Sequence, residues 1–95
     1  MFARVTVVEG PPDRIDEAIR IFRETVIPGA KTFKGFKGSY FLVDRKTGKQ
    51  MGVALWETEA DIIASTEAAA RLRAPFAKAA MVQPRVEIYE VGAQA

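Results

Sequence analysis

Alternating apolar and polar positions divide the chain into four extended segments and two amphipathic ones. Four runs are rich in β-branched and aromatic residues, the composition typical of strands. These predicted strands are residues 2–9 (FARVTVVE), 39–44 (SYFLVD), 50–57 (QMGVALWE) and 85–91 (RVEIYEV). A glycine-rich loop over residues 31–38 precedes the second strand. A short polar connection with Gly48 near its end then joins the second strand to the third, as in a hairpin.

The two amphipathic segments show apolar residues at steps of three and four, which predict helices lying on a core. The first helix is expected to begin at Asp13 and to end at Pro28-Gly29. The second follows Thr58, a predicted N-cap, and Pro75 is expected to kink or break it, leaving residues 76–81 as a further helical piece. The predicted inward residues are Ile15, Ala18, Ile19, Phe22, Val26 and Ile27 in the first helix, and Ile62, Ile63, Thr66, Ala69 and Leu72 in the second.

The order of these elements is β-α-β-β-α-β, which predicts a ferredoxin-like α+β domain. In that arrangement two right-handed crossovers build one antiparallel sheet with both helices on one face. Neither side of the predicted strands is cleanly polar, whereas a sheet with one solvated face should alternate clearly. A partly apolar second face indicates a contact surface. We therefore expect a symmetric homodimer through the sheet face, and a monomer with scattered surface apolar groups is the alternative.

Composition narrows the possible chemistry further. The 95 residues make one domain, residues 1–95, with a net charge of +2 and neither cysteine nor histidine. Disulfides, imidazole or thiolate metal sites and histidine-dependent catalysis are thereby excluded, and no metal site or cofactor is expected. Lys31, Lys34 and Lys37 alternate with aromatic residues, but the small net charge argues against nucleic-acid binding. No apolar run is long enough for a membrane helix, so we expect no membrane partner and a cytoplasmic location.

Residues 35–65 (GFKGSYFLVDRKTGKQMGVALWETEADIIAS) resemble the antibiotic biosynthesis monooxygenase branch of the dimeric α/β-barrel superfamily. The matching parts are the Gly-Phe-x-Gly start, the hairpin ending in an apolar strand, and Leu-Trp-Glu-Thr-Glu running into an acidic helix start. The resemblance implies dimers that pair sheet against sheet, and a mostly apolar pocket between each sheet and its helices. It also implies oxidation of electron-rich phenols or quinols without metal or flavin, although the fold alone does not determine activity. The haem-degrading subfamily uses a histidine and an asparagine, and this chain contains neither residue.

The resemblance makes Trp56, the sole tryptophan, the candidate catalytic residue. The candidate substrate-binding residues are Tyr40, Phe41, Phe22, Phe76, Arg4 and Tyr89. Core or surface packing is the alternative for each of these aromatic residues. Arg4 has a plainer alternative as the cross-strand partner of Glu87 or Glu90. Glu57 is a candidate base if it is buried, and a solvated residue otherwise.

Two functions remain open at this level. The first is binding of a small apolar or aromatic ligand in the sheet–helix pocket. The most specific version of this hypothesis is a cofactor-independent monooxygenase that acts on an electron-rich phenol or quinol. Small residues beside Trp56, namely Gly52 and Ala54, favour this because they leave space for a planar ligand. The alternative is a non-catalytic ligand-sensing or stress-associated dimeric module, which the lack of histidine supports. A purely structural interaction domain is a third possibility.

Overall fold

The fold is described from a computed structural model, which covers the backbone of residues 1–80 and 84–95 and the side chains of residues 1–75 and 84–95. The strands are β1 (Phe2–Glu9), β2 (Phe36–Val43), β3 (Lys49–Trp56) and β4 (Arg85–Glu90). A 3₁₀ turn (Pro12–Arg14), α1 (Ile15–Ile21), a π-helical turn (Phe22–Val26) and α2 (Ile27–Ala30) follow β1, and α3 (Glu59–Ala80) follows β3. Within these residues no helix has the length and apolar character needed to span a membrane.

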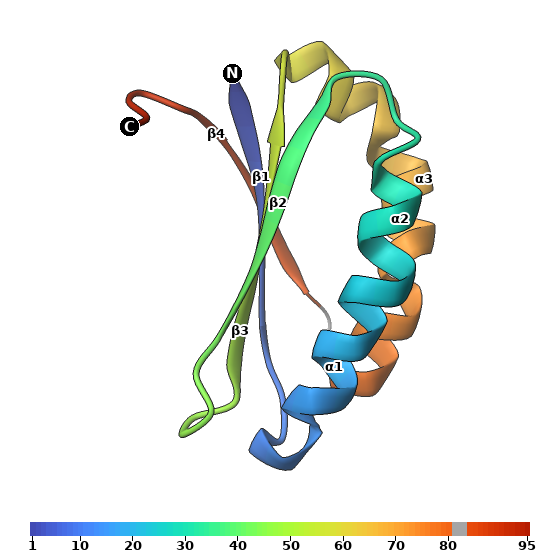
Figure 1. Cartoon of the computed structure of the whole chain (residues 1–95), viewed down its shortest axis with the longest axis vertical. Helices are drawn as coiled ribbons and strands as arrows, with labels where there is room; N and C mark the ends of the chain where they lie inside the picture. The colour runs from blue at the N-terminus through green and yellow to red at the C-terminus, as the bar shows by residue number, and fades with distance from the viewer. Residues whose placement is uncertain (81–83) are drawn as a thin grey trace.

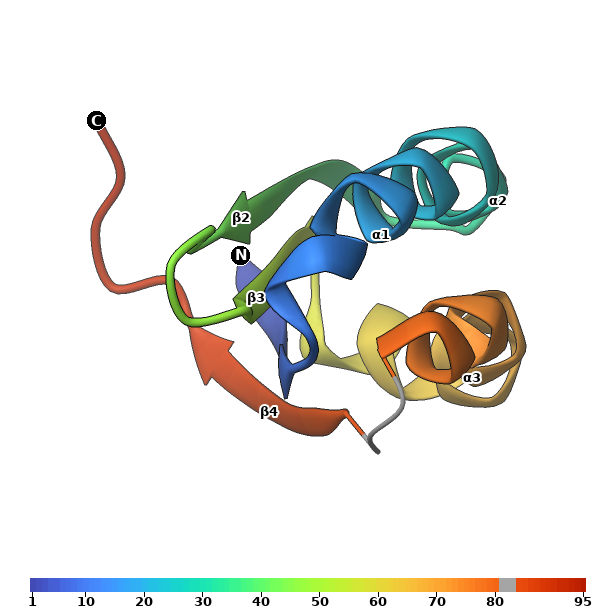
Figure 2. The same ribbon diagram turned by 90° about the horizontal axis from the view of Figure 1, so that it is seen from below.

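The four strands form one antiparallel sheet in the order β2-β3-β1-β4. Both helical segments lie on the same side of this sheet, and no element of the described chain covers the opposite side (Figure 1). Seen from below, the helices form a second layer, and β2 and β4 lie at the two edges of the sheet (Figure 2). The predicted ferredoxin-like α+β fold is confirmed. β1 has the predicted bounds, and Gly48 has the expected left-handed backbone, with φ of 84°.

The register decides which side of each strand faces the helices. In β1, Arg4 and Thr6 pair with Ala54 and Gly52 of β3, so these four residues share the helix-facing side with Trp56. The sequence left this orientation open because both sides are partly apolar. β2 begins at Phe36, three positions before the predicted start, and its first residues pair irregularly with β3 near Gly38, whose φ is 146°. Such an irregular start breaks the alternation on which strand prediction depends.

The first helical run does not end at Pro28-Gly29, contrary to the prediction. It continues through α2 to Ala30. Ile27 donates its backbone N–H to the Phe22 carbonyl, five residues earlier. The helix therefore has a wider, π-helical turn just before the proline. Pro28 then occupies the first turn of α2, where the missing N–H of a proline is tolerated.

The second helix begins as predicted, because Thr58 Oγ1 accepts a hydrogen bond of 3.1 Å from the Asp61 backbone N–H. The expected break at Pro75 is wrong, since α3 continues through it to Ala80. Pro75 and Arg71 are both exposed, so water can satisfy the Arg71 carbonyl that loses its helical donor. Residue 81 of the expected further piece lies outside the described residues.

The inward side of α3 also differs from the prediction. Ile62 is fully buried and Ala69 is buried, but Ile63 and Thr66 are exposed and Ser65 is buried instead. Ser65 donates its hydroxyl to the Ile62 carbonyl and accepts a hydrogen bond from Arg4, so a polar residue takes a core position without an unmet hydrogen bond.

Candidate functional site

A cavity lies between the sheet and the helices, towards the end of the sheet where β3 runs into α3. Its volume is about 50 Å³, and about 590 Å³ of free space surrounds it when the opening to solvent is included. Strands β1, β2 and β3 form its floor, while the π-helical turn, α2, the loop after it and α3 form its walls. The lining residues are Arg4, Thr6, Phe22, Val26, Ile27, Ala30, Phe33, Phe36, Ser39, Gly52, Ala54, Trp56, Ala69, Leu72 and Arg73.

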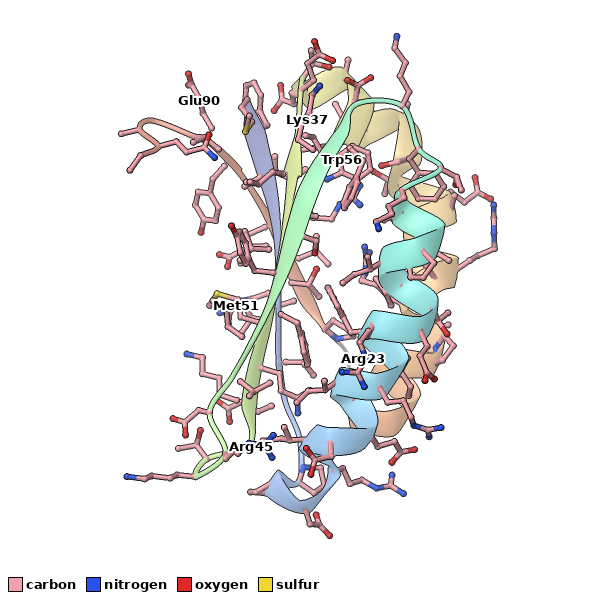
Figure 3. All side chains as sticks on the ribbon, viewed as in Figure 1. Arg23, Lys37, Arg45, Met51, Trp56 and Glu90 are labelled. Atoms are coloured by element: carbon pink, nitrogen blue, oxygen red, sulfur yellow. The ribbon has the colours of Figure 1, made fainter. Side chains whose placement is uncertain are left out.

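Trp56 occupies the layer between the sheet and the helices (Figure 3). Its side chain is 1% exposed, and its ring stacks on Phe33 at 6.3 Å and meets the edge of Phe36 at 5.6 Å. The indole Nε1–H is buried and has no hydrogen-bond partner in the described structure. An unpaired buried donor costs about 1–3 kcal/mol and therefore calls for an explanation. Trp56 lines the cavity, so we consider an acceptor supplied by a ligand, which would have to reach a nitrogen that is closed to solvent in this structure.

Arg4 extends from β1 to α3 along the wall of the same cavity. Its Nη2 donates to the Ile62 carbonyl at 2.8 Å and to Ser65 Oγ at 3.0 Å. The guanidinium lies 5.3 Å from the centre of the Trp56 ring, within range of a cation–π interaction. Burial, and next the nearby Arg73 guanidinium, lower the pKa of Arg4 to about 10, so Arg4 is cationic at neutral pH.

The suggested ion pair of Arg4 with Glu87 or Glu90 is wrong. Arg4 lies opposite Ile88 in the ladder, and its only described partners are on α3 and β3. Glu87 instead accepts the Tyr89 hydroxyl at 3.0 Å and lies 3.8 Å from Arg85. Strand alternation explains the result for Glu87, which points to the side opposite Ile88. Glu90 lies on the Arg4 side but pairs two positions along, with Phe2.

Arg73 is the second cation of the cavity, and the sequence analysis did not single it out. It comes from α3 and is partly buried, which lowers its pKa. Among the described residues no side chain or carbonyl forms a hydrogen bond or ion pair with it. A helical signal for it was present: Arg73 lies four residues after the buried Ala69 and therefore on the same face of the helix.

The aromatic wall of the cavity rests on small residues of β3. Phe22 lines the cavity and stacks on Phe41 behind it, with 4.7 Å between ring centres and 16° between planes. A Cβ added at Gly52 would lie 3.2 Å from Phe22 Cε2, so glycine is what lets this ring pack against the sheet. Ala54 also lines the cavity. Both small residues therefore border the open space that the sequence suggested beside Trp56.

The remaining candidates are not brought to this cavity. Tyr40 and Tyr89 are exposed on the opposite side of the sheet, so the expectation that they contact a ligand in the pocket is corrected. Their positions alternate with those of the inward residues of the same strands. Glu57 is exposed and lies 3.9 Å from Lys37, as its solvated alternative predicted. The side chain of Phe76 lies outside the described residues.

These features define what the site can do chemically. Phe22, Phe33 and Trp56 provide flat apolar surfaces, while Arg4, Arg73 and the Trp56 Nε1–H provide hydrogen-bond donors and positive charge. The described lining residues include no carboxylate, and the chain contains no histidine. The site is therefore equipped to bind a planar ligand bearing an acceptor, and its described residues supply no ordinary side-chain base.

No family model matches the sequence. Two uncharacterized proteins of Mycobacterium tuberculosis H37Rv are similar along nearly the whole chain. Rv2558 is 32% identical over 91 residues, which is 96% of this chain and 39% of that protein. Rv2557 is 31% identical over 93 residues, which is 98% of this chain and 42% of that protein. The chain thus spans about two fifths of the length of these relatives.

Solved structures match the fold over almost the full length. A monooxygenase from Streptomyces coelicolor, ActVA-Orf6 with bound nanaomycin D, gives a TM-score of 0.79 at 17% identity over 99% of this chain and 90% of that one. The heme degrader MhuD of M. tuberculosis, with two hemes bound, has a TM-score of 0.79 and 17% sequence identity. The match covers 100% of this chain and 99% of that one. An antibiotic biosynthesis monooxygenase has a TM-score of 0.72 and 19% sequence identity, and the match covers 98% of this chain and 100% of that one. The resemblance found in the sequence is confirmed at the level of structure: this chain has the fold of the antibiotic biosynthesis monooxygenases.

Proposed function

We propose that this protein binds an electron-rich phenol or quinol in the cavity beside Trp56 and oxidises it with dioxygen as a cofactor-independent monooxygenase. The observation that carries this proposal is the unpaired indole N–H of Trp56, a residue that lines a mostly apolar cavity with several aromatic rings. Fold neighbours support it, since one is a monooxygenase solved with the ligand nanaomycin D. The activity of the heme degrader is not transferred, because the chain has no histidine to hold the iron.

The proposed reaction needs no electron donor besides the substrate. A phenol with a free para carbon and one O₂ give a quinone and one water. The ring supplies four electrons, a new C–O bond replaces the C–H bond at that carbon, and the second oxygen atom leaves as water with the two hydrogens. The reactive form is the phenolate, which can pass an electron to oxygen directly. The protein then has to bind this anion and keep bulk water from the intermediate.

The cavity residues take distinct parts in this reaction. Trp56 is the proposed catalytic residue, because its N–H can donate to the oxygen on which negative charge develops. Arg4 and Arg73 favour the ionised phenol, since nearby cations lower the pKa of an acid. Phe22 stacks against the substrate ring. The phenol proton passes to solvent as the phenolate forms, and the para C–H proton leaves with the departing oxygen as water, so this scheme uses no side-chain base.

A second function is favoured by one specific observation, the absence of a carboxylate from the described lining residues and of histidine from the chain. Under this alternative the cavity binds an aromatic metabolite without turning it over, and the protein is a ligand sensor. Binding and oxygen consumption separate the two functions, because a sensor binds the phenol but consumes no oxygen.

Oxygen uptake with 1-naphthol, which has a free para carbon, measured beside ligand binding, tests the proposal. We expect the Trp56→Phe variant to lose at least about tenfold in rate, because it keeps an aromatic ring and removes the donor. Tyr89→Phe is the matched control: it removes a phenol from the opposite face and should leave the rate unchanged. A folded Trp56→Phe protein with the wild-type rate would remove Trp56 from the mechanism.

We further propose that two copies associate through the side of the sheet that the helices leave uncovered. This side carries partly or strongly exposed apolar residues from several strands, namely Val5, Tyr40, Leu42, Met51, Val53, Leu55 and Tyr89. Leu42 and Tyr89 are about half exposed, at 51% and 50%. A broad apolar face of this kind is unusual on a monomer, and a two-fold axis would bury both copies of it at once.

A further inference from the structure

Among the described residues, the positive charge around the cavity has no matching negative charge. Arg4 and Arg73 both lie on its wall, and no described aspartate or glutamate does. Two exposed arginines of the described chain do have carboxylate partners: Arg45 contacts Asp16 at 3.0 Å and Arg71 contacts Glu67 at 3.2 Å. The two cavity arginines are close enough for the charge of one to lower the pKa of the other. Their repulsion in a partly desolvated site costs free energy that a bound anion would offset.

Donors on this wall also outnumber their acceptors. A guanidinium carries five N–H donors, and the two hydrogen bonds of Arg4 both use Nη2. Arg73 has no partner among the described residues, and the Trp56 Nε1–H is unpaired although the side chain is 1% exposed. Arg4, Arg73 and Trp56, from β1, α3 and β3, therefore bring donors to one mostly apolar space, where the other polar side chains among the described residues are the hydroxyls of Thr6 and Ser39.

Resting on the proposed aromatic site, we propose that the cavity selects an aromatic acid, that is, a planar ring system bearing a carboxylate or a similarly compact anion. The ring lies against Phe22 and Trp56, and the anion accepts hydrogen bonds from Arg73, which leaves the Trp56 indole N–H for the reacting oxygen of the proposed function. Arg4 is a positioning residue, because its hydrogen bonds to α3 hold its guanidinium against the Trp56 ring.

A matched pair of probes tests this inference. We would titrate the full chain with 2-naphthoate and with its neutral counterpart 2-naphthamide by calorimetry. The single indole N–H resonance in ¹⁵N spectra would be followed in parallel, because the chain has one tryptophan. We expect naphthoate to bind at least about tenfold more tightly than the amide, as for hydrogen bonds to a charged group, and to shift the indole resonance.

Variants of α3 locate the selectivity. Arg73→Gln should remove the preference for naphthoate and leave the affinity for the amide unchanged, and Arg73→Lys should retain part of the preference. Arg71→Gln is the control, because Arg71 is an exposed arginine of the same helix outside the cavity lining. It should keep the full preference. If Arg73→Gln loses its folded spectrum, Arg73→Met, with a similar aliphatic stem, replaces it.

The outcomes separate this inference from the function on which it rests. Equal binding of naphthoate and naphthamide by the wild-type protein overturns the selectivity and leaves the aromatic site intact. Equal loss of preference in Arg71→Gln and Arg73→Gln overturns the assignment to Arg73, because general charge would then be responsible. If neither probe binds, both the selectivity and the proposed aromatic site are overturned.

Discussion

Single residues show how closely the cavity depends on backbone geometry. Gly35 precedes β2, and its carbonyl accepts the Glu57 backbone N–H at 2.8 Å, which ties this loop to the end of β3 beside Trp56. Its φ is 83°, in the left-handed region, and a Cβ there would collide with the carboxylate of Asp61. Gly35 therefore contacts both the start of α3, at Asp61, and the end of β3, next to Trp56.

Replacing Gly35 with alanine should destabilise the fold. The left-handed backbone and the collision with Asp61 together predict a loss of about 1–3 kcal/mol in the free energy of unfolding. Denaturant unfolding measures this loss. Gly92→Ala is the control, since a Cβ there meets nothing within 4 Å, and it should change stability by less than about 0.5 kcal/mol. A wild-type midpoint for Gly35→Ala would show that the loop moves without penalty.

At the scale of elements, the helices form the wall of the cavity through local irregularity. The π-helical turn Phe22–Val26 contributes Phe22 and Val26 to the lining, and α2 continues the wall. A π turn shifts the following side chains around the helix axis compared with a regular helix. Gly29 of α2 then allows close contact with α3, because a Cβ there would lie 2.5 Å from Leu72 Cδ2.

Substitution of Pro75 measures how much free energy of unfolding α3 loses by containing a proline. It lies inside the helix and is exposed, so Pro75→Ala should restore one helical hydrogen bond and stabilise the protein by about 1–3 kcal/mol. Thermal and denaturant unfolding measure this gain. Ala74→Gly at the neighbouring exposed position should instead lose about 1 kcal/mol, which checks that this turn is helical in solution. A destabilised Pro75→Ala protein would mean that the proline itself stabilises the fold.

At the scale of the whole molecule, one layer of helices covers one side of one sheet (Figure 2). The cavity lies inside this two-layer unit, and the proposed interface lies on its other side. The two functions of the sheet are therefore separable: substitutions on the uncovered side are expected to change association before they change the ligand site. Arg4 and Trp56 belong to the covered side.

Association through the uncovered side is tested by Leu42→Lys. Leu42 is 51% exposed there, and burying an unpaired lysine against a second sheet is unfavourable, so the variant should sediment as a monomer where the wild type is a dimer. Ile63→Lys is the matched control, because Ile63 is 64% exposed on the solvent side of α3. Sedimentation equilibrium measures both. A monomeric wild-type protein contradicts the proposed dimer directly.

Local patterns were sufficient for much of the fold. The strand at residues 2–9, the Thr58 cap, the Gly48 hairpin and the buried positions Ile15, Ala18 and Ile62 each depend on propensities within a few residues. The early start of β2 and the continuous α3 were missed because neighbouring strands and helices stabilise conformations that local propensity disfavours. For the site, Trp56, Phe22 and Arg4 were predicted to lie in the pocket, whereas Arg73 was missed and the tyrosines were placed wrongly.

The amino-acid sequence by itself determined the order of strands and helices, the absence of imidazole and thiol chemistry, and the candidacy of Trp56, because these follow from residue type and short-range spacing. Only the tertiary structure decided which side of the sheet faces the helices, and therefore that Arg4 and Trp56 lie inward while Tyr40 and Tyr89 lie outward. The physical reason is that both sides of the strands are partly apolar. The sequence therefore shows which residues share a side of the sheet, but not which side faces the helices. The packing of the helices, in which Arg4 is hydrogen-bonded to α3, determines which side faces them.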